Sequence, residues 1–166
     1  MSGPLTPSQT VGPFFGVGLP FENGEQIAPA GSAGVIRIEG QVFDGKGAPV
    51  PDALLEIWQI GSGFGRSRTD AEGAFSFVVV KPAPTPAPDG RMQAPHLNVT
   101  VFARGLLRHL VTRMHFPDET EANATDPVLN LVEPARRETL IAKSCAGVLH
   151  FDIRLQGERE TVFFAI

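Results

Sequence analysis

The sequence predicts an all-β protein, a β-sandwich with short helical excursions, and three observations carry this prediction. The 18 Gly and 15 Pro residues divide the 166-residue chain into short segments. Between these breaks, apolar residues alternate with polar ones or form short runs, and they do not recur at helical spacing. Seven segments of strand length follow one another, which is typical of a sandwich. The length suits one domain, so we expect a single domain over residues 1–166 with an extended N-terminal arm over about residues 1–33.

Alternating apolar residues locate the strands, and turn residues separate them. The expected strands, in chain order, cover residues 35–43, 53–59, 74–80, 97–103, 109–116, 149–153 and 161–164. Residues 44–47 and 70–73 each begin with aspartate and end with glycine, a combination typical of tight turns. We therefore expect a turn at the end of the first strand and another before the third.

Three further segments interrupt this β pattern. Residues 118–123 are acidic and tolerate a helix, and residues 134–140 begin with proline, which favours the first position of a helix. Residues 82–88 have proline at every second position. Because each proline removes a hydrogen-bond donor from a sheet, we expect an extended loop there and no central strand.

Charge and cysteine content narrow the classes of function. The formal net charge is −4, and charges of both signs are interspersed, which argues against nucleic acid or an acidic membrane as a partner. The single Cys145 cannot form an internal disulfide, residues 1–12 lack a signal-peptide pattern, and no apolar run approaches the roughly 20 residues of a membrane span. We expect a soluble cytoplasmic protein whose partners are small molecules or other proteins.

Two blocks of the chain carry a specific combination of motifs. Ile57-Trp58-Gln59 is followed by the turn Arg66-x-x-Thr69-Asp70. With Gly40-Gln41-Val42-Phe43-Asp44 before them and Gly73-Ala74-Phe75-Ser76-Phe77 after them, these motifs resemble the core of the intradiol ring-cleaving dioxygenases. Residues 6–14, 127–131, 137–140 and 161–164 extend the resemblance over nearly the whole sequence. The resemblance implies a β-sandwich of the intradiol dioxygenase type. Some members of the family are built from two kinds of chain, and this sequence most resembles their alpha chain.

The resemblance also implies where the metal is held. Catalytic chains of the family bind Fe(III) through two tyrosines and two histidines, a set that suits the ferric ion. This chain contains no tyrosine. The loop that would carry the first is deleted at residues 60–64, and Pro82-Ala83-Pro84-Thr85 stands where the second is expected. His96 matches the first histidine, Asn98 replaces the second, and Gln93 replaces a nearby arginine. We therefore expect no metal ligand and no catalytic residue on this chain, and Fe(III) on a homologous beta chain in an alpha–beta hetero-oligomer.

The alpha chain of such a complex closes the substrate pocket from the side opposite the iron. By motif match, Thr10, Gly12 and Pro13 would line the pocket near the aromatic ring, and Arg104 would lie near the carboxylate of protocatechuate. The resemblance implies that the complex opens this ring with O2 to give 3-carboxy-cis,cis-muconate, in the beta-ketoadipate pathway of aromatic catabolism.

Two alternatives remain open from the residues. The chain could be a free-standing, transthyretin-like β-sandwich binding module, although such a module has no reason to carry the terminal segments of the dioxygenase pattern. It could instead be an autonomous dioxygenase with unusual ligands, for example His96 with Asp70 or Glu56.

Overall fold

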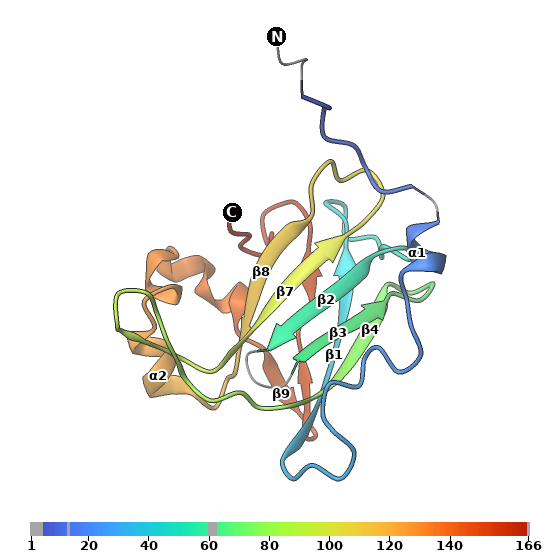
Figure 1. Cartoon of the computed structure of the whole chain (residues 1–166). Coiled ribbons are helices and arrows are strands. Elements are labelled where there is room, and N and C mark those ends of the chain that lie inside the picture. Colours follow the sequence, from blue (N-terminus) through green and yellow to red (C-terminus); the bar gives the residue numbers. More distant parts are fainter. Residues whose placement is uncertain (1–4, 13, 60–62, 166) are drawn as a thin grey trace.

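Two β-sheets face each other in the structure, a computed structural model that describes residues 5–12, 14–59 and 63–165 (Figure 1). In the first sheet, β1 (Val35–Phe43) pairs antiparallel with β4 (Ala74–Val80) on one side. On its other side β1 pairs parallel with β10 (Val148–His150) and then β11 (Ile153–Arg154). The short β9 (Lys143–Cys145) pairs with β10 at the edge.

The second sheet is antiparallel throughout. Its order is β3 (Gly63–Arg68), β2 (Leu54–Gln59), β7 (His96–Phe102) and β8 (Leu110–His115). A separate two-stranded sheet joins β5 (Thr85–Pro86) to β6 (Met92–Gln93). The helices are α1 (Phe15–Gly18), α2 (Thr120–Thr125), η1 (Leu129–Leu131) and η2 (Pro134–Leu140). The fold is therefore an all-β sandwich with short helices, as the sequence predicted.

The core lies between the two sheets, because alternate residues of each strand point inward. The inward positions of the first sheet include Ile38, Val42, Phe77 and Val79, and those of the second include Leu55, Ile57, Leu97, Val99, Val101 and Met114. Each of these side chains is 4% exposed or less. The opposite faces of β1 and β7 carry polar residues such as Arg37, Glu39, Asn98 and Thr100, which explains the alternation in those segments.

Both turns predicted from Asp–Gly segments are present and are built in the same way. Asp44 Oδ1 accepts the backbone N–H groups of Lys46 and Ala48, and Asp70 Oδ1 accepts those of Glu72 and Ala74. The glycine that ends each turn, Gly47 or Gly73, has a positive φ (80° and 72°), which favours glycine because it lacks a Cβ.

Several strand predictions need correction. Residues 161–164 form no strand, because only single backbone bonds leave them, from Thr161 N to Arg154 O and from Phe164 N to Val111 O. β3 was not predicted, since its sequence is rich in glycine, arginine and serine. The strand predicted over 149–153 is interrupted between β10 and β11, and a two-residue strand, β5, lies in the loop predicted over 82–88.

The helix predictions for residues 118–123 and 134–140 are confirmed by α2 and η2, and η2 has proline at its start. Figure 1 shows both lying to one side of the sandwich, past the end of β8. No helix within the described part of the chain has the length and apolar character to cross a membrane.

Candidate functional site

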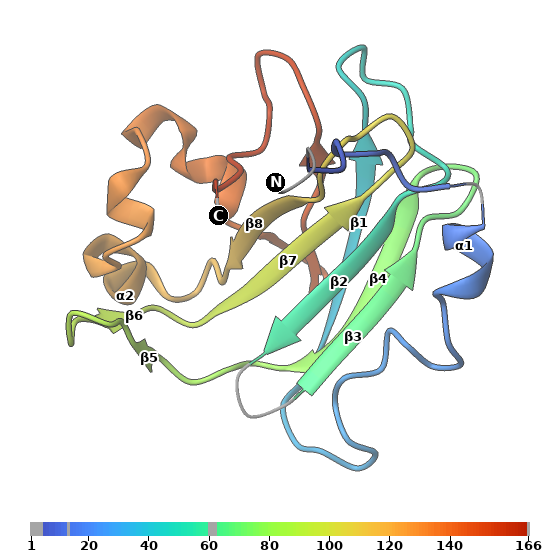
Figure 2. The ribbon, with the colours of Figure 1, turned by 45° about the horizontal axis from the view of Figure 1, so that its top comes forward.

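The N-terminal arm is fixed to the second sheet at several points. Thr10 Oγ1 accepts a hydrogen bond of 2.8 Å from the backbone N–H of Gly105, in the turn after β7. Further along, Arg68 and Arg66 of β3 donate to the carbonyls of Gly16 (3.2 Å) and Leu19 (2.5 Å). These bonds hold α1 against the β3 side of the sheet, as Figure 2 shows. The two arginines that follow the Trp–Gln motif therefore anchor the arm.

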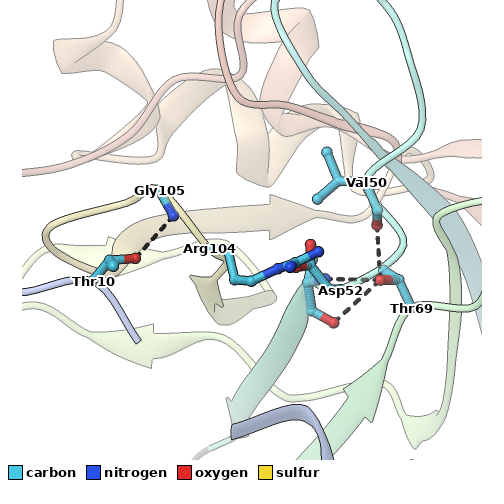
Figure 3. Close-up of polar contacts among 7 residues, drawn as sticks. Thr10, Val50, Asp52, Thr69, Arg104 and Gly105 are labelled. Carbon is cyan, nitrogen blue, oxygen red and sulfur yellow. Dashed lines mark hydrogen bonds and ion pairs between the residues drawn. The ribbon is translucent and has the colours of Figure 1, made fainter. Parts of the chain in front are cut away.

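Arg104 lies just beyond the end of β7, beside the point where Thr10 is anchored. Its Nε forms an ion pair with Asp52 Oδ2 (Figure 3). The arginine side chain is 63% exposed and the aspartate side chain 24% exposed. Because Leu54 of β2 pairs with Phe102 of β7, continuing this antiparallel register by two residues on each strand places Asp52 opposite Arg104. The sheet itself thus brings the two charges together.

The turn that carries Asp52 is held from inside the protein by Thr69. Its buried hydroxyl accepts the N–H of Ala53 at 2.9 Å and lies 2.8 Å from the carbonyl oxygen of Val50 (Figure 3). The Thr69 backbone N–H also donates to Ala53 O. The threonine of the Arg-x-x-Thr-Asp motif therefore has a structural role: it ties the end of β3 to the turn that precedes β2.

A groove of about 600 Å³ adjoins the arm and the turn between β7 and β8. Apolar side chains make most of its walls, with Arg108 and His109 among the lining residues and no carboxylate side chain among them. The apolar residues include Val11, Phe102, Leu106, Leu107, Leu110 and Phe163. An apolar surface beside an exposed arginine suits an anionic aromatic molecule or an apolar protein surface.

The structure brings together two of the four site residues predicted from the sequence. Thr10 binds the residue that follows Arg104 in the chain. Gly12 is exposed, and its carbonyl accepts the N–H of Phe15 at 3.2 Å. Pro13 lies outside the described residues. Sequence reasoning missed Asp52, since it stands 52 positions from Arg104 and only the strand register relates the two.

The position matching the first histidine ligand implied by the resemblance lies in a buried histidine pair. His96 of β7 faces His115 of β8, with ring centroids 5.7 Å apart, and His96 Nδ1 lies 2.8 Å from Ala94 O. Nearby Asp126 accepts three backbone N–H groups. No cluster of three His, Cys, Asp or Glu residues within the described ranges could hold a metal, and the sequence has no tyrosine. These residues do not fit the family's iron site.

The alternative ligands considered for an autonomous metal site have other partners. Glu56 Oε1 receives two hydrogen bonds from Arg66, at 2.9 and 2.5 Å. Asp70 Oδ1 caps its own turn, as described above. The structure therefore places both carboxylates in structural roles and does not join them to His96 in a metal-binding cluster.

His115 is fully buried, and neither of its ring nitrogens has a hydrogen-bond partner within the described structure. Burial lowers the pKa of His115 to about 4, with His96 and Arg113 acting in the same direction and Asp126 and Asn123 opposing. A histidine with a lowered folded-state pKa is protonated first in the unfolded chain. Stability should therefore be full above about pH 6.5 and fall as the pH approaches 4.

We expect the free energy of unfolding to fall by about 2 kcal/mol between pH 7 and pH 5, a window in which few carboxylates titrate. Denaturant unfolding of the purified protein at the two pH values measures this. The variant His115→Gln should lose most of the pH dependence, whereas His150→Gln, at an exposed position, should keep it. A wild-type stability that is equal at pH 7 and pH 5 would contradict the assignment.

Comparison with known proteins identifies related chains. A family model described as Dioxygenase matches residues 11–157. The "Protocatechuate 3,4-dioxygenase alpha chain" of Pseudomonas putida is 42% identical over 193 residues, covering 97% of this chain and 96% of the relative. The alpha chain of the same name from Burkholderia cepacia is 43% identical and covers 97% of both. The beta chain from Burkholderia cepacia is 29% identical, covering 84% of this chain and 70% of the relative.

Solved structures share the fold at lower sequence identity. The dioxygenase domain of a dioxygenase–carbohydrate-binding fusion from Streptomyces sp. SirexAA-E has a TM-score of 0.60 at 23% identity, covering 92% of this chain and 99% of that one. Hydroxyquinol 1,2-dioxygenase from Pseudomonas putida DLL-E4 also has a TM-score of 0.60, at 22% identity, and the match covers 93% of this chain and 67% of that one. The sandwich described above is therefore the fold of these dioxygenases.

Proposed function

This chain belongs to the dioxygenase family, among the intradiol ring-cleaving dioxygenases, and we propose that it is the alpha chain of a protocatechuate 3,4-dioxygenase. The observation that carries the proposal is the identity of 42% and 43% to two such alpha chains, each across 97% of this chain. The enzyme would cleave the protocatechuate ring between its two hydroxyl-bearing carbons and add both atoms of O2. A match of this extent favours the subunit over a free-standing binding module.

The family uses iron, and in the proposed complex a homologous beta chain holds it as Fe(III). Support comes from this chain's own residues. The sequence offers no phenolate ligand, and His96 is packed against His115 in a buried pair. The last residues paired between β2 and β3 are Gln59 and Gly63, so only three residues connect the two strands. This connection leaves little length for a loop that could carry a ligand. When bound in the partner, the iron supplies the activation of the catechol for reaction with O2.

The proposed contribution of this chain is one wall of the substrate pocket. Thr10, Gly12 and Pro13 would face the aromatic ring, and Arg104 would offset the charge of the carboxylate. The anchoring of Thr10 to Gly105 supports a common surface for the arm and the arginine. Glycine allows the backbone to approach a flat ring, and a guanidinium pairs well with a carboxylate. Pocket shape and charge at this wall would orient the substrate toward the iron.

Co-expression with the matching beta chain tests the proposal. We expect the two chains to purify together and to consume O2 when protocatechuate is added, while this chain alone consumes none. The beta chain expressed alone serves as the control for activity that does not need this chain. Failure of the two chains to associate, or turnover of protocatechuate by this chain alone, would overturn the proposed subunit role.

A further inference from the structure

We infer that Asp52 is a positioning residue: it holds the Arg104 guanidinium in the orientation in which it meets the substrate carboxylate. The inference rests on the proposed function, because it concerns how Arg104 is presented at the pocket wall. It assigns a role to a residue that the family motifs and the sequence pattern do not mark.

The contact with Asp52 leaves the two terminal nitrogens of the guanidinium free to bind a carboxylate. Asp52 binds through Nε of Arg104, and the two terminal nitrogens have no hydrogen bond to the described residues. Those two nitrogens form the edge of the guanidinium that can bind a carboxylate with two parallel hydrogen bonds. With the side chain 63% exposed, arginine would otherwise sample many rotamers. The ion pair at Nε restricts these rotamers.

Asp52 can act in this way because its own backbone is fixed. The carbonyl of Val50 on one side and the N–H of Ala53 on the other are both hydrogen-bonded by the Thr69 hydroxyl. Val50 N also donates to Val42 O of β1, at 2.9 Å. Arg104, in turn, precedes Gly105, whose N–H binds Thr10. A continuous set of contacts therefore runs from the buried Thr69 through Asp52 and Arg104 to the arm (Figure 3).

Asp52 has two opposing effects on substrate binding. Whether kcat/KM rises or falls when Asp52 is replaced shows which effect is larger. As a negative charge near the pocket, Asp52 repels an anionic substrate, so its removal would strengthen binding if charge alone mattered. As the partner of Arg104, it fixes the guanidinium, so its removal weakens binding. Exposed ion pairs contribute modestly, which corresponds to changes of roughly twofold to fivefold in kcat/KM.

The test is a double-mutant cycle in the assembled alpha–beta enzyme, with protocatechuate and catechol as substrates. Catechol lacks the carboxylate. We expect Asp52→Ala and Asp52→Asn to lower kcat/KM for protocatechuate by roughly twofold to fivefold, mainly through KM, and to leave kcat/KM for catechol unchanged. Asp52→Glu should restore part of the loss. In an Arg104→Ala background, removing Asp52 should cause no further fall in kcat/KM for protocatechuate. Asp89→Ala removes a similar exposed ion pair, with Arg91, and should change nothing.

A rise in kcat/KM would overturn the inference, because Asp52 would then act mainly by repelling the substrate. No change would also overturn it, because Asp52 would then have no role in substrate binding. An equal fall with both substrates, or a fall that persists without Arg104, would show that Asp52 acts on the fold and not through the arginine. If Arg104→Ala itself has no effect, the inference fails while the subunit role, which depends on association and O2 uptake, still stands. Asp52→Asn, which keeps the size of the side chain, covers the case in which Asp52→Ala does not assemble.

Discussion

Replacing Arg104 with alanine in the assembled enzyme is expected to lower kcat/KM for protocatechuate by roughly 10- to 100-fold, chiefly by raising KM. The substrate carboxylate would lose a charge-assisted, two-point contact at the pocket wall, while the iron and the ring hydroxyls would keep theirs. Arg104→Lys should recover only part of the loss, because an ammonium group cannot reproduce the two parallel hydrogen bonds. Initial rates at varied substrate concentration, with protocatechuate and with catechol, measure the effect.

The matched control for this variant is Arg37→Ala. Arg37 is also an exposed arginine in an ion pair, with Glu39, but it lies on β1 of the other sheet. It should leave both substrates unaffected. If Arg104→Ala lowers the rates with protocatechuate and catechol to the same extent, Arg104 does not recognise the carboxylate, and the proposed arrangement of the pocket wall is wrong.

Gly40→Ala is expected to destabilise the protein by about 3 kcal/mol or more, or to prevent folding. Gly40 is buried in β1, where β10 and β11 meet on one side and β4 runs on the other. A Cβ at this position would overlap the carbonyl oxygen of Phe151 and lie 2.7 Å from the Phe75 ring. The backbone oxygen cannot move without separating the strands, so any relaxation that removes the clash would itself destabilise the sheet.

Thermal or denaturant unfolding of the purified protein measures this effect. Gly18→Ala is the matched control, because a Cβ there meets no atom within 4 Å and the residue lies at the end of α1. It should leave stability nearly unchanged. Wild-type stability in Gly40→Ala would mean that the close approach of Phe151 to β1 is absent from the folded protein.

The sequence predicts the parts of the fold in which local pattern and burial agree. β1 and β4 begin and end where apolar alternation predicts, because one face of each is packed in the core. β3 lies at a sheet edge, so its polar sequence carries little alternation. Residues 161–164 alternate like a strand, but isolated backbone bonds join them to Arg154 of β11 and Val111 of β8, and they form no ladder. The parallel pairing of β1 with β10 and β11 joins distant segments, and no local signal indicates it.

The candidate site is predictable only in part, for a related reason. Arg104 and Thr10 could be proposed by matching motifs along the chain. Asp52 and the support from Thr69 depend on the register of β2 against β7, which is a property of the folded sheet. A resemblance supplies residues that are named in motifs, whereas their supporting contacts become visible only in three dimensions.

The iron content of the purified alpha–beta complex, measured per pair of chains and alongside this chain expressed alone, tests the proposed subunit role. We expect one iron per pair and none retained by this chain on its own. Two irons per pair, or stoichiometric iron on the isolated chain, would contradict it, because this chain would then hold a metal site of its own.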